Sequence, residues 1–239
     1  MMMINRSKAF NWDCTTTATT MAATTTDVKT LFGLPPTSQS VKEYISSLYS
    51  LANSGNDDKV RVKAYPDAVF VNYYSLGCSI EYRPTNGYRP PSNVQSITDL
   101  QTDKLALDKI DIYNSPPDDS EPETTQKAKS KTTPVFAKYP GLPLMISFSR
   151  EPGSISVTSE STGKDFVAAL GEPDRKGGGS GPSSGSINIW CEWTKEGFMV
   201  EFGGRDARSP QAWDKGKDAT WKVLSLFLPL PPQPPPSSN

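Results

Sequence analysis

Alternating apolar and polar positions mark several segments of the chain as strands. In "CSIEY" (Cys78–Tyr82) and "FMVEF" (Phe198–Phe202) every second side chain is apolar, and the residues between them are Ser, Glu or Met. A period of two residues indicates a strand with one buried face. Each segment is separated from a preceding apolar run by a glycine, Gly77 or Gly197, and glycine readily adopts the positive φ that tight hairpin turns need. The pattern therefore predicts two β-hairpins with a glycine at each turn.

A short helix is expected before each hairpin and a third strand after it. The third strands are "LDKIDIYN" (Leu107–Asn114) and "WKVLSLFL" (Trp221–Leu228). The helices are "DVKTLFGLP" (Asp27–Pro35) and "DFVAALGEP" (Asp165–Pro173), which align without gaps and share Asp, Gly and Pro. In the first block, the segment that connects the helix to the hairpin includes a second expected helix, Val41–Leu51.

The two helical segments also begin and end alike. Gly33 and Gly171 occupy the position at which a left-handed residue terminates a helix, and a proline follows two residues later, where a helix cannot continue. Thr26 in the first segment and Ser161 or Thr162 in the second are expected near the helix starts, where hydroxyl side chains cap free N–H groups.

The order helix, strand, strand, strand occurs twice, which we interpret as an internal duplication. The sequence therefore predicts an α+β protein of two tandem helix-plus-three-stranded antiparallel units, residues 27–113 and 136–228. Whether the units share one sheet is left open. Three segments have too few apolar residues to fold and are expected to be disordered: the Thr-rich tail 1–26, the charged linker 114–135 and the Pro-rich tail 229–239. The Pro-rich tail is interpreted as a spacer, with recognition by an SH3 or WW domain as the alternative.

The glycine-rich run "DRKGGGSGPSSGS" (Asp174–Ser186) raises the question of a phosphate site. A Walker A loop places its lysine after the glycines and leads from a strand into a helix, whereas Lys176 precedes the glycines and the run leaves a helix. The spacing Gly-x-Gly-x-x-Gly also fails, because Ser184 stands at its last position. We therefore expect a flexible connector between the helix and the first strand of the second unit.

Composition limits the chemistry, because the 239 residues include no histidine. Ser-His-Asp and Cys-His nucleophile arrangements are excluded, and the commonest metal ligand is missing. Cys14, Cys78 and Cys191 are too far apart in sequence for a paired zinc-ligand motif. Glu81 and Glu201 could form an acid and base pair, but equivalent positions of a duplicated fold lie far apart. We expect no enzyme, no cofactor and no metal, and a hydrolase using carboxylates or a Ser-Lys pair is the less favoured alternative.

Charge and hydropathy bear on partners and location. The chain has 25 basic and 26 acidic residues, which argues against binding to nucleic acid. No run reaches the roughly 18 apolar residues of a membrane-spanning helix, and the N-terminus lacks the apolar region of a secretory signal. An odd number of widely spaced cysteines favours reduced thiols. We expect a cytoplasmic protein with no transmembrane segment, and leave peripheral membrane contact open.

Aromatic and basic side chains supply the candidate interaction surface, because Trp and Tyr are enriched at binding hot spots. Phe70, Tyr74 and Trp190 alternate out of register with their apolar neighbours, so they are either core residues beneath covering helices or anchors for a partner. Trp213 lies in a polar run that offers little core, which favours an interface. Arg175 and Lys176 could meet an anion. The candidates are Phe70, Tyr74, Trp190, Trp213, Arg175 and Lys176.

Several motifs resemble the eukaryotic phagosome assembly factor family. They are "NYYSLGCSIEY" (Asn72–Tyr82), "DKIDIYN" (Asp108–Asn114), "KYPGLP" (Lys138–Pro143) and "LGEP" (Leu170–Pro173). Members of that family are typically much longer, and here a linker of about twenty residues precedes the Tyr-Pro-Gly. The resemblance implies a non-catalytic adaptor of autophagy that acts with a β-propeller protein. A fainter resemblance links the chain to bacterial lipoprotein and inhibitor folds with a Leu-Gly-x-Pro element, which are also binding proteins.

These observations lead to two main functional hypotheses. The first is a non-catalytic protein-binding adaptor that uses an exposed sheet face, with a β-propeller protein as the implied partner. The alternative is a lipid or small-ligand binding protein with a pocket between helix and sheet. In that case Arg175 and Lys176 are expected near the mouth of the pocket, and a pocket lined by Tyr82 and Phe202 would favour this ligand-binding hypothesis.

Overall fold

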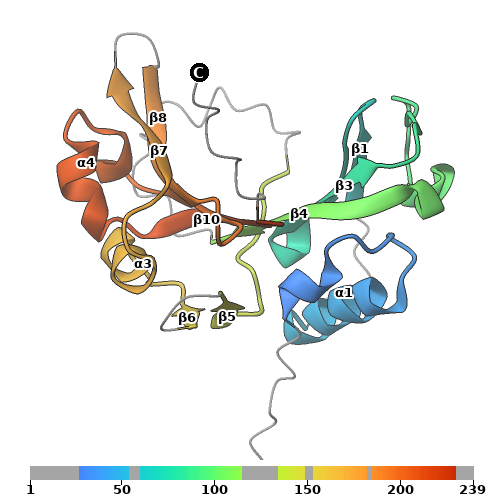
Figure 1. Ribbon diagram of the computed structural model, residues 1–239, viewed down its shortest axis with the longest axis horizontal. Coiled ribbons are helices and arrows are strands. Elements are labelled where there is room, and N and C mark those ends of the chain that lie inside the picture. Colours follow the sequence, from blue (N-terminus) through green and yellow to red (C-terminus); the bar gives the residue numbers. More distant parts are fainter. Residues whose placement is uncertain (1–26, 54–59, 115–133, 149–152, 182–184, 230–239) are drawn as a thin grey trace, which may run out of the picture.

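A single large antiparallel sheet dominates the computed structural model, which describes residues 27–53, 60–114, 134–148, 153–181 and 185–229. The sheet has eight strands in the order β1-β2-β3-β4-β10-β9-β8-β7. In Figure 1 it is seen close to edge-on, with helices α1 and α3 and the small β5–β6 sheet on one side of it. The two halves of the chain therefore share one sheet.

The elements have the following bounds. The large sheet consists of β1 (Val60–Ala64), β2 (Val69–Tyr73), β3 (Cys78–Pro84), β4 (Leu105–Tyr113), β7 (Arg175–Gly181), β8 (Gly185–Trp193), β9 (Phe198–Phe202) and β10 (Trp221–Phe227). The two-stranded sheet pairs β5 (Leu144–Ser147) with β6 (Ser154–Val157). The α-helices of the described residues are α1 (Gln39–Leu51), α3 (Gly163–Leu170) and α4 (Ala212–Lys215). Short 3₁₀ helices are η1 (Val28–Leu31), η2 (Tyr74–Leu76), η3 (Ile97–Asp99), η4 (Thr102–Lys104), η5 (Asp206–Arg208) and η6 (Gly216–Asp218).

The predicted α+β fold of two helix-plus-three-strand units is wrong, because the structure is mostly β and each half contributes four strands to the large sheet. The two predicted hairpins are present as β2–β3 and β8–β9. The prediction missed β1 and β7, the two edge strands. The first expected helix is only the four-residue η1, while the second is α3.

Strand β7 occupies the glycine-rich run that was expected to be a flexible connector. Glycine is disfavoured in strands in general, but here the neighbouring strand β8 leaves no room for a side chain at Gly177 or Gly178. A Cβ added to Gly177 would lie 2.6 Å from the Trp190 ring, and Gly178 has a φ of +85° at a break in the register with β8. The glycines therefore allow β7 to lie beneath a large indole, and the connector prediction is wrong for this reason.

The last strands of the two halves meet at the centre of the sheet, where β4 pairs with β10. The turn glycines Gly77 and Gly197 both have positive φ, +59° and +67°. Their carbonyl groups accept equivalent hydrogen bonds, Gly77 from the Tyr113 N–H at 2.9 Å and Gly197 from the Phe227 N–H at 3.0 Å. The strand order and these bonds match on the two sides of the central pair, and the internal duplication stays a prediction.

The two faces of the sheet differ in character. We call the face covered by α1, α3 and the β5–β6 sheet the helix face; the strands contribute to it, among others, the buried side chains of Val71, Ile80, Ile110, Leu224, Val200 and Cys191. These side chains belong to one hydrophobic core that spans both halves. Burial of each large apolar side chain contributes roughly 1.5–3 kcal/mol relative to exposure. We call the other side the opposite face.

The ends of the helical segments agree in part with the predicted caps. Thr162 is the N-cap of α3, and the Asp165 carboxylate accepts hydrogen bonds from its N–H at 2.7 Å and its hydroxyl at 2.9 Å. Gly33 and Gly171 both have positive φ. The N-cap of η1 is Asp27, which accepts from the Lys29 N–H at 3.1 Å.

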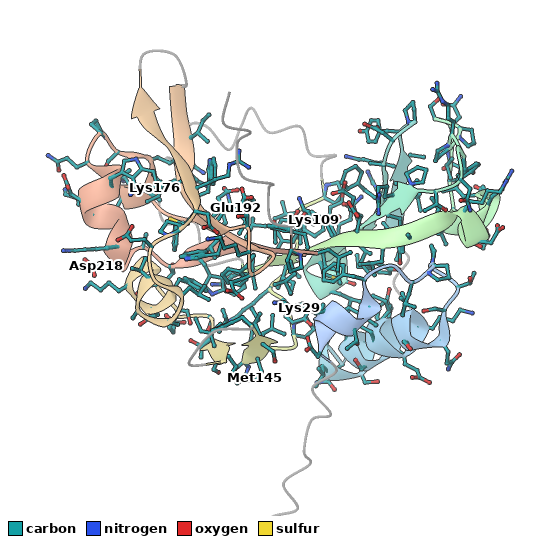
Figure 2. The ribbon with its side chains drawn as sticks, in the orientation of Figure 1. Lys29, Lys109, Met145, Lys176, Glu192 and Asp218 are labelled. Atoms are coloured by element: carbon teal, nitrogen blue, oxygen red, sulfur yellow. The ribbon has the colours of Figure 1, made fainter. Side chains whose placement is uncertain are left out.

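Lys29 joins three parts of the helix side of the molecule (Figure 2). Its ammonium group donates to the carbonyl of Ser147 on β5 at 2.6 Å and to that of Glu196 in the β8–β9 turn at 2.9 Å. Burial lowers the pKa of Lys29 from 10.5, although the carboxylates of Glu196 and Asp27 act in the opposite direction. The lysine thus fixes η1 against the second half of the chain.

The predicted disordered tail 1–26 lies outside the described residues, as do most of the linker and most of the Pro-rich tail. Over the ranges that the structure does describe, none of the helices combines the length and the apolar content that crossing a membrane requires.

Candidate functional site

A groove opens between α3, α4 and the helix face of the sheet, and we call it the α3–α4 groove. Its volume is about 410 Å³. It is lined by Gly163, Lys164, Val167, Ala168, Glu172, Pro173, Lys176, Ile189, Cys191, Phe202, Trp213, Gly216 and Lys217. The elements that line it, α3, α4, β7 and β8, are on the left in Figure 1, at one end of the large sheet.

The floor of the groove is apolar. Ile189 and Cys191 are alternate residues of β8 and so lie on the same face. Phe202, the last residue of β9, lies beside them. All three are buried, with at most 7% of their surface exposed. The walls add two exposed apolar side chains, Val167 on α3 and Trp213 on α4, which are 38% and 45% exposed.

Two glycines let the helices approach each other at the end of the groove. A Cβ on Gly163, the first residue of α3, would lie 3.1 Å from the carbonyl oxygen of Gly216. A Cβ on Gly216 would in turn overlap the side chain of Ile189. The ion pair of Lys164 with Asp218 also links α3 to η6. The backbone therefore brings α3 and η6 together over β8.

The rim of the groove is basic. Lys176 of β7 lies over the Trp213 ring, with Nζ 5.7 Å from the ring centroid. Lys176 is also 4.0 Å from the carboxylate of Glu172, in an exposed i,i+4 pair. Figure 2 shows Lys176 and Asp218, both labelled, near α4. Three lysines and one glutamate are thus the charged residues of the lining.

Cys191 is the thiol in the floor of the groove. Burial raises the pKa of Cys191 to about 11, although Lys176 opposes the shift. At neutral pH the group is therefore a protonated thiol, and nucleophilic cysteines need the thiolate. The side chain contributes apolar surface to the floor. The other described cysteine, Cys78, is fully buried in the first half, and burial raises its pKa too.

The structure divides the six predicted surface residues between several places. Lys176 and Trp213 meet in the groove. Arg175, the neighbour of Lys176 in β7, is on the opposite face, where it forms an ion pair with Glu192 at 3.3 Å and lies 5.9 Å from the centroid of Trp190. The expectation that Arg175 and Lys176 share a pocket mouth is therefore wrong, because consecutive strand residues point to opposite faces.

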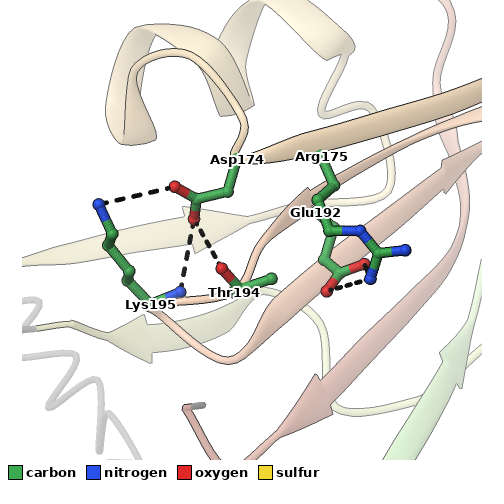
Figure 3. Close-up of polar contacts among 5 residues, drawn as sticks. All are labelled: Asp174, Arg175, Glu192, Thr194 and Lys195. Atoms are coloured by element: carbon green, nitrogen blue, oxygen red, sulfur yellow. Dashed lines mark hydrogen bonds and ion pairs between the residues drawn. The ribbon is translucent and has the colours of Figure 1, made fainter. Parts of the chain in front are cut away.

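Polar contacts hold the start of β7 in this position (Figure 3). The carboxylate of Asp174 accepts hydrogen bonds from the Thr194 hydroxyl at 3.1 Å and from the Lys195 N–H at 3.4 Å. The Lys195 ammonium group is 3.8 Å from the same carboxylate. Together with the Arg175–Glu192 pair, these contacts fix which face of the sheet Lys176 reaches.

The remaining candidates lie in the first half. Tyr74 is buried in η2, and its ring is 4.4 Å from that of Phe136, centroid to centroid. Phe70 is half-buried on the opposite face and makes an edge contact with Tyr65 at 6.0 Å. The structure does not bring these two residues to the groove. Tyr82, which was expected to line a ligand pocket together with Phe202, is buried in the first half and does not line the groove.

The opposite face carries a row of residues across the sheet that are all polar except for one methionine. The pairing of the strands aligns Arg61, Asn72, Ser79, Asp111, Ser225, Met199, Glu192 and Arg175. Within it, Ser79 donates to Asn72 at 3.0 Å and Ser225 donates to Asp111 at 2.6 Å. None of the three α-helices described lies over this face in Figure 1.

Glu81 and Glu201 both point to the opposite face, on β3 and β9. The strands β4 and β10 lie between them, so β3 and β9 are about 14 Å apart, given a spacing of ~4.8 Å between strands. The pairing also offsets the two residues by four positions along β10, which adds about 13 Å along the strand direction. Paired carboxylates of glycoside hydrolases lie within about 5–9.5 Å of each other. The distance is too large for that chemistry.

A second hollow of about 410 Å³ lies beside the segment "KYPGLP", which carries part of the family resemblance. It is lined by Lys138, Tyr139, Pro140, Leu142, Pro143, Thr158 and Ser159. Tyr139 is buried, and its hydroxyl forms a hydrogen bond of 3.0 Å with that of Tyr44. This hollow lacks the apolar floor of the α3–α4 groove.

Sequence reasoning named Lys176 and Trp213 as candidate surface residues and Phe202 as a pocket residue, but it did not predict that the lining residues come together. The polar run around Trp213 contains two small buried residues, Ala207 and Ala212, which pack against the core. Two alanines in a polar run are a weak signal for a packed helix. The alternation in β8 predicted that Ile189 and Cys191 share a face, but nothing in it showed which helix covers them.

The described ranges contain no cluster of three or more acidic or cysteine side chains that could hold a metal ion. Comparisons with known proteins add no assignment. No family model, no curated protein and no solved structure matches this chain.

Proposed function

We propose that this chain is a non-catalytic binding protein that holds a small apolar ligand in the α3–α4 groove. The observation that carries the proposal is the groove itself. Its volume of about 410 Å³ falls within the range of about 300–1,000 Å³ of small-ligand sites, which are lined mainly by apolar side chains and a few polar groups. Such a pocket between helix and sheet is the one that the ligand-binding hypothesis requires.

The exposed apolar side chains of the walls would be removed from water when a ligand binds. Val167 and Trp213 are both more than one-third exposed, and removal of apolar surface from water contributes about 25 cal/mol per Å². Burial raises the pKa of Cys191 to about 11, so nearly all of the thiol is protonated at neutral pH. The protonated form is a poor nucleophile, which supports binding over covalent chemistry at this site.

Titration calorimetry with 1-decanol, a neutral apolar probe, tests the proposal. Ala168 is exposed on the α3 wall of the groove, so Ala168→Phe should fill the groove without burying a polar group. We expect the wild-type chain to bind decanol and Ala168→Phe to lose that binding. Ser46→Phe, which adds a ring to an exposed position of α1, is the matched control and should bind as the wild type does. Absence of decanol binding by the wild-type chain would contradict the proposal.

A protein-binding adaptor is the second candidate function. It is favoured by the opposite face, which the described α-helices leave uncovered, and by the resemblance that implies a β-propeller partner in autophagy. Met199 lies near the middle of this face on β9. The matched control is Met145 on β5, which is 44% exposed outside the large sheet.

Affinity purification of the tagged full chain from fed and starved cells tests the adaptor. If the opposite face binds a partner, the wild-type chain and Met145→Glu should recover the same protein, and Met199→Glu should lose it. Equal recovery by all three chains would place the partner elsewhere, and recovery of no specific partner would leave this candidate without support.

A further inference from the structure

We infer that the ligand of the α3–α4 groove is a short acyl chain with a free carboxylate. The inference rests on the proposed function, because it concerns the same groove, and it adds the charge of the ligand. It follows from the basic residues at the rim of an apolar floor. An acyl chain would lie on the floor formed by Ile189, Cys191 and Phe202, and its carboxylate would lie at the lysines.

The charged residues of the lining are unbalanced. Lys164, Lys176 and Lys217 contribute three positive charges, and Glu172 contributes one negative charge. Lys164 already has a close partner in Asp218, which does not line the groove. Lys176 and Lys217 are therefore the cations that a ligand can use.

The side chain of Lys176 is held in place, but its positive charge is only weakly balanced by a neighbouring carboxylate. Its ammonium group lies 5.7 Å from the centroid of Trp213, which holds the side chain along the wall. Its distance to Glu172 is 4.0 Å, and the Glu172 side chain is 83% exposed. Exposed ion pairs of this kind contribute little, so a ligand carboxylate can replace Glu172 as the partner of Lys176.

Lys217 stands on η6, which packs against the first residue of α3. Within the part of the chain that the structure describes, Lys217 forms no ion pair at 4.0 Å or less. An anion at the groove would therefore gain a charge-assisted hydrogen bond at this lysine without breaking an existing pair.

The chemistry of the rim favours a carboxylate over a phosphate. With Lys164 paired to Asp218, Lys176, Lys217 and Glu172 leave the lining a net charge of +1. This matches the single negative charge of a carboxylate better than the charge of about −1.5 to −2 of a phosphate monoester. Free N–H groups at a helix start also bind phosphate, but at α3 the Thr162 N–H already donates to the Asp165 carboxylate and the Gly163 N–H to the Ala219 carbonyl at 3.3 Å. The volume of about 410 Å³ is at the small end of the range for ligand sites, which favours a short acyl chain.

Titration calorimetry with decanoate, 1-decanol and decyl phosphate tests the inference. We expect the wild-type chain to bind decanoate more tightly than decanol. Lys176→Met and Lys217→Met should each weaken decanoate binding by about two- to five-fold, the range for single exposed charge pairs, and leave decanol binding unchanged. Lys42→Met, which removes an exposed lysine from α1, should change neither affinity. Thermal melts of the wild-type chain and the three variants check that each is folded. Lys217→Met changes an exposed residue of a short helix, so its effect is independent of the contact between Lys176 and Trp213.

The outcomes separate this inference from the proposed function. Equal affinities for decanoate and decanol would overturn the inference that the ligand carries a carboxylate, and would leave the proposal of an apolar ligand in place. Tighter binding of decyl phosphate than of decanoate would replace the carboxylate with a phosphate. Binding of none of the three probes would overturn the inference and the proposed function together.

Discussion

Gly77 is one of the positions at which a single added methyl group should be most destabilising, together with Gly178 and Gly197. The residue has a φ of +59° between η2 and β3. A Cβ added there would overlap the carbonyl oxygen of Ala137 and lie 2.7 Å from the backbone nitrogen of Tyr139. These neighbours are backbone atoms, so no side chain can rotate away to make room.

The cost of Gly77→Ala has two parts. The left-handed conformation costs a residue with a Cβ about 1–2 kcal/mol. Displacement of the segment around Ala137 would also weaken two hydrogen bonds, from the Ala137 N–H to the Tyr74 carbonyl at 2.8 Å and from the Tyr139 N–H to the Tyr113 carbonyl at 2.9 Å. Each contributes about 0.5–1.5 kcal/mol, so we expect a total loss of about 2–5 kcal/mol.

Urea denaturation followed by tryptophan fluorescence measures this loss, and Gly87→Ala is the matched control. Gly87 has a φ of +72°, but a Cβ there would meet no atom within 4 Å. The control therefore isolates the backbone strain, and we expect it to lose only about 1–2 kcal/mol. A loss for Gly77→Ala no larger than that for Gly87→Ala would refute the close approach of residues 137–139 to this turn.

Three further predictions concern single side chains. Lys29→Met leaves the carbonyls of Ser147 and Glu196 without their donor, and urea denaturation should show a loss of about 1–2 kcal/mol, given the usual cost of an unsatisfied polar group; an unchanged midpoint would contradict the role of Lys29. Burial, as the largest cause, raises the pKa of Glu81 above 4.5, so the contribution of this side chain to stability falls as the pH rises from about 4.5 through the raised value. In thermal melts the Tm of Glu81→Gln should exceed that of the wild type at pH 7 and equal it at pH 4, and the same difference in Tm at both pH values would refute the effect of burial. With a pKa of about 11, only ~1 in 1,000 Cys191 groups is a thiolate at pH 8. Alkylation of Cys191 in a Cys14→Ser chain, followed by mass spectrometry, should therefore accelerate about ten-fold per pH unit up to about pH 10, whereas a rate that levels off at about pH 9 would show an ordinary thiol.

Local patterns predicted the strands that have one apolar face and failed for the strands at the edges of the sheet. The alternation around Ile80 and Val200 follows from burial of one face in the core, so it is visible in the sequence. In β7 the position of Trp190 on the next strand makes glycine necessary at Gly177, and a contact between strands leaves no periodic pattern in either one. The short, partly exposed β1 lay in a segment that was interpreted as a connector.

The groove was predictable only in its parts. Trp213 stood out as an aromatic residue among polar ones, and Lys176 stood out beside the glycines. Their contact depends on α4 packing over β7, which is a matter of tertiary structure. Arg175 and Lys176 could have been separated from the start had the glycine-rich run been recognised as a strand, because adjacent strand residues face opposite sides.

The pairing of β4 with β10 has a consequence for the order of events during synthesis. Ile112 and Leu224 are paired although they are 112 positions apart in sequence, and closing a loop of that length costs about 4 kcal/mol in chain entropy. Until the ribosome has released the residues of β10, the inner edge of β4 has no partner from its own chain. An unpaired edge of this kind is a template for other chains. A nascent or truncated chain that ends before Trp221 should therefore depend on chaperones far more than the finished protein does.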